Sequence, residues 1–405
     1  MNPPLHGVRV LDLSRVLAGP WATMQLADLG AEVIKVERPG AGDDTRAWGP
    51  PWFENEAGER LTSSYYLSAN RNKKSVAIDL ASEKGQAIVR ALAAKSDIVV
   101  ENFKQGGLKA YGLDWEALKA VNPRLVYCSI TGFGQDGPRA HEAGYDFMIQ
   151  GMSGLMSVTG PIGGEPYRVG VALADVLTGL NATIAILAAL RHAEATGEGQ
   201  QIDVALFDVA VASMANQALG YLVSGEAPGR IGNTHPSITP YQAFPTKDGH
   251  IILAIGNDGQ FSRFVRQAGR PELADDPRFT TNALRTANRP ALVPIVTELL
   301  AARTTAEWMA LLSQHAVPCG PINSLDATFA DPQAGHRGLR LAMPSAHGQV
   351  PGVRSPHRLS ASPAVEPVAP PMVGENSAEV LSGLLGLDAA EIAALAASGV
   401  IAGSR

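Results

Sequence analysis

The stretch VRVLDLSRVLAGPWATMQLADLGAEVIKVE, residues 8–37, decides the fold. Its two ends, residues 8–13 and 32–37, are apolar runs of strand length. Residues 21–29 between them have the spacing of a helix, which Gly30 should end. Two strands joined by one helix predict a βαβ unit with parallel strands and a right-handed crossover.

The same alternation continues to about residue 135 and predicts an open parallel sheet. Ser82 should cap a helix between two of the further strands. A long apolar helix, residues 176–194, should pack on this layer. We therefore expect an α/β fold with Rossmann-like βαβ units and a second, smaller α+β domain. The further strands are expected at residues 75–79, 97–101 and 125–131.

Changes in composition along the chain predict the domain boundaries. Residues 1–200 are expected to form the large domain, and residues 201–227 a linker. Turn-forming residues become frequent from about Pro228, so residues 228–330 are expected to form the smaller domain. Residues 331–405 should return as an extended, Pro-rich segment and complete the large domain with two short helices.

The composition limits the class of protein. The chain has 405 residues, of which 45% are hydrophobic and 18% charged, and its net charge is −6. This length allows two cores, and the scattered Lys and Arg residues argue against nucleic acid as a partner. Cys128 and Cys319 are too few for a disulfide framework, and we expect no metal site. Without a visible leader or an apolar run long enough to cross a bilayer, a soluble cytoplasmic protein is expected.

Asp175 is the residue that the sequence singles out for chemistry. It follows the short apolar stretch 169–174 and opens the long apolar helix. A carboxylate there meets free N–H groups and the positive end of the helix dipole, so we expect it to stay ionised near neutral pH. A nucleophile requires this state, and an ordinary helix N-cap shows it too. The pattern alone leaves both roles open.

The turns of the predicted sheet indicate which phosphate site to expect. The first βα turn, SRVLAGPW at residues 14–21, lacks the glycine fingerprint for NAD, and no GxxxxGK[ST] loop for ATP occurs. Ligands bind at the carboxyl ends of strands in open parallel sheets, so polar loops there could hold a phosphorylated, nucleotide-bearing ligand. Taken singly, each cation could equally be a solvated surface charge. The loop residues that suggest such a ligand are Arg38, Arg71, Lys73, Lys74, Asn102, Lys104 and Phe103, which could face an adenine.

Ten segments, taken in order, resemble a known family. They are LDLSRVLAGPWATMQLADLGAEVIKVERPGAGDDTR, LSANRNKKSVAIDL, VENFKQG, SITGFGQDGP, GYDFMIQGMSGLMSVTG, GVALADVLTG, TGEGQQIDVALFD, GNTHPSITPYQAFPTKDGHI, VPCGPIN and APPMVGENSAEVL. Together they run nearly the length of the chain. Their order and spacing resemble the family III CoA-transferases, which include formyl-CoA, carnitine and several dicarboxylate CoA-transferases.

The resemblance implies which residues act. The family's nucleophilic aspartate falls on Asp175. Ala110 stands where some relatives carry a basic residue, and Arg71 or Lys104 could compensate for it. Certain relatives carry a glycine-rich loop over the aspartate, for which this chain offers only GRIGNTHPS, residues 229–237. The implied CoA contacts are Val16, Leu17, Arg38, the NRNKKS loop with Arg71, Lys73 and Lys74, Asn102, Phe103, and the segment from Thr131 to Arg139.

The resemblance also implies a reaction. CoA would move from an acyl-CoA to a carboxylic acid through an acyl-aspartyl anhydride and an aspartyl-CoA thioester. CoA thioesters would be substrates, and no permanently bound cofactor is expected. Family members form interlocked dimers, so a homodimer is implied, with no nucleic acid or membrane as a partner.

Two other functions remain open. The related α-methylacyl-CoA racemases use a His–Asp pair where this chain has Tyr145 and Asp146. A tyrosine with a pKa of about 10 is a poor base for that task. Asp146 is then expected to hold a neighbouring loop by hydrogen bonds. The remaining possibility is a non-catalytic CoA-binding protein in which Asp175 only caps its helix.

The acceptor acid follows from one block of the resemblance. GNTHPSITPYQAFPTKDGH, residues 232–250, resembles the branch that takes succinyl-CoA as donor and dicarboxylates as acceptors. Short dicarboxylic or hydroxy-dicarboxylic acids, such as glutarate, malate or itaconate, are therefore implied. The second carboxylate needs a cation, and the candidates are Arg46, Arg168 and His235.

Overall fold

The computed structural model describes residues 2–403, which divide into two compact units. Of the described residues, unit 1 holds those up to Leu155, Val169–Gly225 and those from Gln333 onward. Unit 2 holds Met156–Arg168 and Glu226–Pro332. The segment 156–168 thus lies outside the large unit in which it was expected. Most of the expected linker 201–227 belongs to unit 1, where it continues as β8 and two helices.

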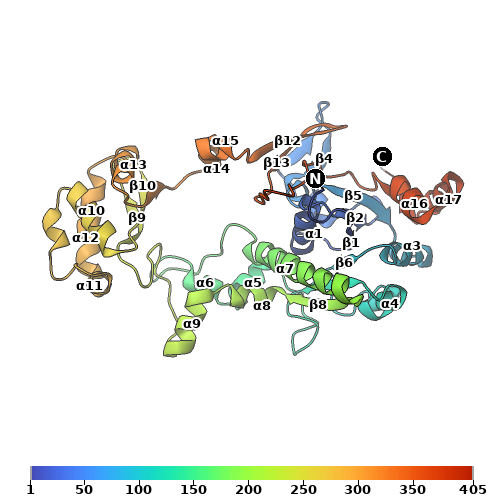
Figure 1. The fold of residues 1–405 in the computed structure, drawn as a ribbon, viewed down its shortest axis with the longest axis horizontal. Helices are drawn as coiled ribbons and strands as arrows, with labels where there is room; N and C mark the ends of the chain where they lie inside the picture. Colours follow the sequence, from blue (N-terminus) through green and yellow to red (C-terminus); the bar gives the residue numbers. More distant parts are fainter. Residues whose placement is uncertain (1, 404–405) are drawn as a thin grey trace. The chain divides into compact units, whose positions relative to one another are not determined.

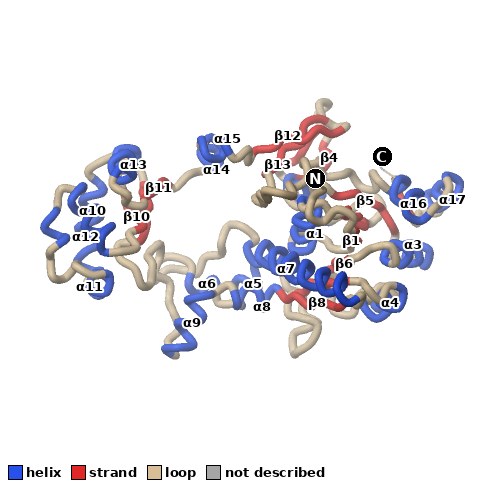
Figure 2. The backbone as a smooth tube through the Cα atoms, viewed as in Figure 1, coloured by secondary structure: helices blue, strands red, loops and turns tan. Residues whose placement is uncertain are grey.

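A seven-stranded sheet forms the centre of unit 1 (Figures 1 and 2). Six strands are parallel, which confirms the predicted sheet, and β14 pairs antiparallel with β5 at one edge. Without β14, the order is that of a doubly wound fold, whose direction reverses between β1 and β6. In spatial order the strands are β14 (Ile401–Ala402), β5 (Lys73–Ile78), β2 (Glu32–Glu37), β1 (Arg9–Asp12), β6 (Ile98–Glu101), β7 (Val126–Thr131) and β8 (Gln200–Ala205).

Helices cover both faces of this sheet because successive strand residues point to opposite sides. Val10 packs in a core with Ala22 and Ile186, whereas Leu11 packs in a second core with Val89 and Leu381. One face carries α1 (Ala18–Asp28), α7 (Leu173–Thr196) and α8 (Leu206–Ala212). The other carries α3 (Glu83–Ala93), α4 (Trp115–Val121), α16 (Ser377–Leu385) and α17 (Ala389–Ala397).

The long helix α7 is more apolar and longer than expected. Among residues 2–403 it is the one unbroken helix that could cross a membrane by length and composition, and the bent pair of α8 and α9 (Ala215–Ser224) passes the same test together. Its residues Ala182 and Ile186 are buried in the core between α1 and the sheet. Gly179 allows this packing, since a Cβ atom there would meet the Ala18 carbonyl oxygen at 2.7 Å.

Unit 2 has its own α+β core. Three antiparallel strands, β9 (Tyr241–Pro245), β10 (His250–Ala254) and β11 (Cys319–Pro321), form its sheet in the order β11-β10-β9. Phe244, Phe264 and Trp308 are buried in the core behind it. The helices of this unit are α10 (Asp258–Gln267), α11 (Asn282–Ala287), α12 (Arg289–Ala301) and α13 (Thr305–Gln314).

Shorter elements complete the chain. Part of the segment expected to be extended forms a hairpin, whose residues Leu341 and Val350 pack against Tyr66. The hairpin strands are β12 (Arg340–Ser345) and β13 (Gly348–Val353). The other elements are β3 (Trp52–Glu54), β4 (Arg60–Ser63), α2 (Ser64–Leu67), α5 (Asp146–Met152), α6 (Leu155–Val158), α14 (Leu325–Ala330), α15 (Pro332–His336) and the 3-10 turns Asp44–Ala47, Lys109–Tyr111 and Pro271–Ala274.

Candidate active site

A pocket of about 190 Å³ opens where the strand order of the large sheet reverses. The loops after β1 and β6 form two of its walls, and the start of α7 contributes a third. This is the position at which doubly wound sheets bind ligands. Its lining includes Arg15, Val16, Leu17, Asn102, Phe103, Lys104, Glu142, Tyr145 and Asp175.

Asp175 lines this pocket from the first turn of α7. The helix begins at Leu173, so Asp175 is its third residue and does not cap it, contrary to one of the two roles left open by the sequence. Asp146 takes the capping role, since its Oδ1 atom accepts a hydrogen bond from the Ala174 N–H at 2.8 Å. Its Oδ2 atom accepts a second bond, from Gln150 Nε2 at 2.9 Å. The structural role expected for Asp146 therefore fits this geometry.

The electrostatics of Asp175 differ from those expected. Burial raises the pKa of Asp175 and the neighbouring carboxylate of Asp146 raises it further, to about 7. The start of the helix acts in the opposite direction, because its dipole favours a carboxylate. Burial dominates, so the expectation of a fully ionised carboxylate at neutral pH is corrected. The nucleophilic form becomes the main one only above about pH 7.

The loop after β1 has a strained backbone beside the pocket. Val16 adopts a φ of 70°, a left-handed conformation that costs a β-branched residue on the order of 1–3 kcal/mol. The Asn102 side chain forms two hydrogen bonds with the backbone of Arg15, the residue before Val16. Its Oδ1 accepts from the Arg15 N–H at 2.8 Å, and its Nδ2 donates to the Arg15 carbonyl at 2.6 Å. The Asn102 side chain therefore joins the loops after β1 and β6.

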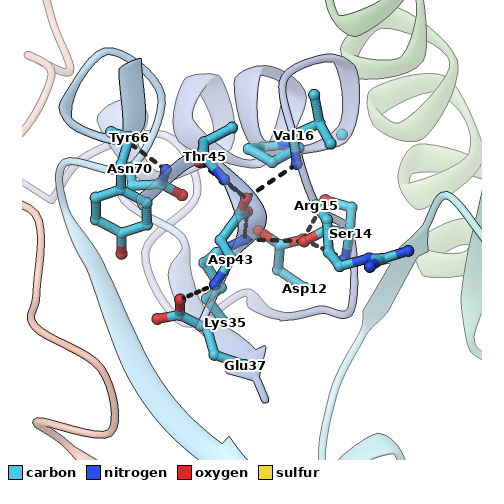
Figure 3. A network of polar contacts seen from close by, with 12 residues as sticks. Asp12, Ser14, Arg15, Val16, Lys35, Glu37, Asp43, Thr45, Tyr66 and Asn70 are labelled. Atoms are coloured by element: carbon cyan, nitrogen blue, oxygen red, sulfur yellow. Dashed lines mark hydrogen bonds and ion pairs between the residues drawn. The ribbon is translucent and has the colours of Figure 1, made fainter. Parts of the chain in front are cut away.

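A buried polar network lies behind this loop (Figure 3). Lys35 Nζ lies 2.9 Å from Asp43 Oδ2, and both side chains are completely buried. The same Nζ donates to the Ser14 carbonyl at 2.8 Å. Asp43 Oδ1 accepts from the Val16 N–H at 3.3 Å and from the Thr45 N–H at 3.0 Å. The network thus extends from β2 to the pocket wall.

The cations before and within β5 do not fit the CoA contacts predicted for them. Arg71 forms a buried ion pair with Asp28, and its Nε donates to Asp28 Oδ1 at 2.8 Å. Lys73 Nζ is fully buried, 3.1 Å from Asp12 Oδ2. Lys74 pairs with Glu32 at 3.0 Å and with Glu379 at 2.8 Å. None of the three lines the pocket, and buried or neighbouring carboxylates already match their charges.

Arg46 does not fit the role of a carboxylate receptor either. Its Nε and Nη2 atoms donate to the two Glu37 oxygens at 2.8 and 2.7 Å. Nη2 also donates to the Pro371 carbonyl at 2.9 Å, and the guanidinium lies 3.6 Å from the Tyr66 ring centroid. These partners occupy the buried guanidinium, which is therefore structural.

A second pocket, of about 290 Å³, shares Arg15 and Phe103 with the first. Arg38, one of the residues predicted to contact CoA, lines it together with Tyr111. Arg15 and Arg38 are exposed and face Asp44 at 3.0 and 3.5 Å. The Arg15 guanidinium lies 5.4 Å from the Phe103 ring centroid. Two solvent-accessible cations and one aromatic ring thus lie beside the adjoining pockets.

A known family matches most of the length of the chain. The sequence model of CoA-transferase family III matches residues 5–377. The chain belongs to this family. It is 51% identical to the succinate–glutarate CoA-transferase of Agrobacterium fabrum, over 95% of this chain and 96% of that one. It is 45% identical to the succinyl-CoA:glutarate CoA-transferase of Homo sapiens, over 98% and 90% of the two chains.

Solved structures agree with the assignment to CoA-transferase family III. The crystal structure of a CAIB/BAIF family protein from Brucella suis has a TM-score of 0.85 and 49% identity, covering 95% of this chain and all of that one. Rv3272 from Mycobacterium tuberculosis has a TM-score of 0.83 and 32% identity, covering 93% and 99%. These matches confirm the family that the sequence resembles, and the protein is a CoA-transferase.

Three further predicted contacts of this family III chain also lie outside the lining of the first pocket. Arg139 lies 3.9 Å from Glu142, which does line it, and 5.6 Å from the Phe133 ring centroid. Arg168 and His235 belong to unit 2, whereas Asp175 belongs to unit 1. His235 Nδ1 accepts a hydrogen bond from the Ser237 N–H at 3.0 Å.

Two residues near Asp175 were not predicted. Arg15 lies in the loop after β1, three residues beyond Asp12, and the rule that ligands bind at strand ends would have indicated it. Burial, Asp175 and Asp146 raise the pKa of Tyr65 to about 12, which shows that Tyr65 lies near both carboxylates. Nothing in the sequence around Tyr65 indicates this, because 110 residues separate it from Asp175.

Proposed function

We propose that this CoA-transferase moves CoA from succinyl-CoA to glutarate or another short dicarboxylic or hydroxy-dicarboxylic acid. The names of the Agrobacterium fabrum and Homo sapiens relatives support this choice of donor and acceptor. The observation that carries the mechanism is the place of Asp175 in the pocket at the carboxyl ends of β1 and β6. Its half-buried carboxyl can present an ionised oxygen to a thioester there.

In the first half-reaction, an Asp175 carboxylate oxygen attacks the thioester carbonyl of succinyl-CoA. A C–O bond forms and the C–S bond breaks, which gives a succinyl-aspartyl anhydride and CoA thiolate. The thiolate then attacks the aspartyl carbonyl carbon and expels succinate. Asp175 is left as an aspartyl-CoA thioester, which keeps the energy of the original thioester without ATP.

In the second half-reaction, a carboxylate of the acceptor attacks the aspartyl-CoA carbonyl and expels CoA thiolate. The resulting acceptor–aspartyl anhydride is attacked by the thiolate at the acceptor's carbonyl carbon. The new acyl-CoA forms and the Asp175 carboxylate is restored. Water must be kept from both activated species, because hydrolysis of either would lose the thioester.

The two adjoining pockets suggest where CoA lies. Arg15, Arg38 and Lys104 are exposed cations on their rims that suit phosphate groups. Phe103 lies between the pockets and suits the adenine ring. We place the pantetheine arm in the first pocket, so that its thioester reaches Asp175.

We further propose a cytoplasmic homodimer. Leu222 and Val223 on α9 and Ile184 on α7 are large apolar side chains with exposed fractions of 73%, 86% and 67%. Apolar exposure of this extent favours a protein partner over water. Light scattering coupled to size-exclusion chromatography would give the mass of the particle, and a monomer would contradict this part of the proposal.

Trapping the intermediate tests the mechanism. The protein is incubated with succinyl-CoA, treated with hydroxylamine, digested and examined by peptide mass spectrometry. A hydroxamate on Asp175 is expected, whereas Asp175→Asn should bind CoA and show neither the adduct nor transfer. Solvent deuterium at the α-carbon of the acyl group would instead indicate a racemase. CoA binding with neither result would indicate a non-catalytic binding protein.

A further inference from the structure

The loop that forms one wall of the first pocket is held in a conformation that its sequence disfavours. Val16 has a φ of 70° although its side chain is β-branched, and Arg15 and Leu17 on either side also line the pocket. Without external support, such a residue would relax to a negative φ. Relaxation would turn the neighbouring peptide groups and change the shape of the pocket wall.

The carboxylate of Asp43, which belongs to the buried network, supports this conformation of Val16. Asp43 lies in the loop after β2, and its Oδ1 accepts the Val16 N–H at 3.3 Å. The same atom accepts from the Thr45 N–H at 3.0 Å and from the Thr45 hydroxyl at 2.8 Å. Its backbone N–H donates to Glu37 Oε2 at 2.8 Å. Asp43 is therefore fixed on its own loop and holds Val16 from there (Figure 3).

The two carboxylate oxygens of Asp43 contact different groups. Oδ2 lies 2.9 Å from Lys35 Nζ, and Oδ1 accepts from the Val16 and Thr45 N–H groups and from the Thr45 hydroxyl. Burial would raise the pKa of Asp43, but Lys35 and the Thr45 N–H lower it to about 2. The group is thus a permanent carboxylate. An amide in its place would turn an NH2 group toward either Lys35 or Val16, and would lose one of the two contacts.

We propose that Asp43 is a positioning residue for CoA binding, which acts through the Val16 backbone. Asp43 also borders the second pocket, but its side chain is completely buried. This inference rests on the proposed function, because it takes CoA as the ligand of the pocket. Asp43 selects the one loop shape in which Arg15, Val16 and Leu17 together form the wall. Such preorganisation lowers the cost of ordering the loop when CoA binds.

The test is a double-mutant cycle with free CoA, whose dissociation constant is measured by calorimetry. Asp43→Asn is expected to weaken CoA binding by about tenfold, because the loop relaxes. Glycine adopts a positive φ without steric cost, so the loop of a Val16→Gly variant should keep its shape without the hydrogen bond to Asp43. In the Val16→Gly background, the same Asp43→Asn change should weaken binding by less than about threefold.

A matched control separates positioning from loss of stability. Asp28→Asn also breaks a buried carboxylate pair, with Arg71, but Asp28 lines neither pocket. It should lower the melting temperature without changing CoA affinity. Should Asp43→Asn not fold, hydrogen exchange on the native protein decides the question. The Val16 amide must then be protected in the CoA-free protein, and rapid exchange there overturns the proposal.

The remaining outcomes are decisive. A folded Asp43→Asn variant that binds CoA like the wild type overturns the inference and leaves the proposed function intact. A loss of affinity of equal size in the Val16→Gly background also overturns it, because the effect would not pass through Val16. Failure of the wild type to bind CoA would overturn the proposed function and this inference together.

Discussion

Asp146 caps the helix that carries Asp175 and also raises the pKa of Asp175. The cap is the 2.8 Å hydrogen bond from the Ala174 N–H, one residue before Asp175, to Asp146 Oδ1. The same carboxylate adds to burial in raising the pKa of Asp175 to about 7. One group thus fixes the start of α7 and weakens the acidity of the proposed nucleophile.

Asp146→Asn should therefore shift the pH dependence of transfer. Removing the negative charge lowers the pKa of Asp175, so the carboxylate persists at lower pH and the acidic limb of the kcat profile moves to lower pH. The Asn oxygen can still accept the Ala174 N–H, so the cap should survive. Measuring kcat from about pH 5 to pH 9 checks this. Asp146→Ala is the control, which should also lose about 1 kcal/mol with the cap. If the acidic limb of the kcat profile of Asp146→Asn lies at the same pH as that of the wild type, Asp146 does not raise the pKa of Asp175.

The half-buried carboxyl of Asp175 should cost stability at alkaline pH. In the unfolded chain it ionises near its usual pKa of 3.8, and in the folded chain at about 7. The folded state therefore binds more protons between these values, and stability falls as pH rises from about 4 to 7. Asp175→Asn should be more stable than the wild type by on the order of 4 kcal/mol at pH 8, with the difference vanishing below about pH 4. Urea unfolding of both proteins at pH 8 and below about pH 4 measures this difference in unfolding free energy. A difference that does not change with pH would contradict the pKa assigned to Asp175.

The sheet could be predicted because its signals are local. Apolar runs such as residues 8–13 and 32–37 contain their own periodicity, and both lie at strands of the large sheet. The roles of the cations could not be predicted in this way. Arg71 meets Asp28, 43 residues away, and Lys73 meets Asp12, 61 residues away. Whether a cation faces a ligand or a buried carboxylate depends on such distant contacts.

Asp175 shows how a small error in a helix boundary changes the chemistry. The expected helix began at residue 176, and the observed one begins at Leu173. This difference moves Asp175 from the cap position into the first turn and leaves the cap to Asp146, 29 residues earlier. The sequence pattern indicates that a carboxylate stands at the helix start. The pattern does not indicate how deeply the Asp175 side chain is buried, and this burial is what raises its pKa most.

Arg46 is expected to matter for stability and not for the choice of acceptor. Arg46→Met leaves the buried Glu37 carboxylate without its bidentate partner, which should cost about 3–5 kcal/mol of unfolding free energy. The double variant Arg46→Met/Glu37→Gln should recover much of this loss, because no buried charge is then unmatched. Denaturant unfolding of the three proteins measures these values. KM for glutarate should stay within about twofold of the wild-type value in the double variant. A selective rise in that KM would return Arg46 to the acceptor site.

Arg15 should contribute to binding of the CoA phosphates. It is exposed and lines both pockets, and among residues 2–403 its ionic partner is the partly exposed Asp44 alone, so its guanidinium can turn to a phosphate. Arg15→Ala should raise KM for succinyl-CoA by about tenfold, equal to about 1.4 kcal/mol, with little change in kcat. Added salt should raise the wild-type KM more than that of the variant, since it screens an exposed charge pair. Arg60→Ala is the matched control, because Arg60 is an exposed cation over the Trp52 ring that lines neither pocket. Equal KM values and equal salt dependence for Arg15→Ala and Arg60→Ala would rule out a phosphate contact by Arg15.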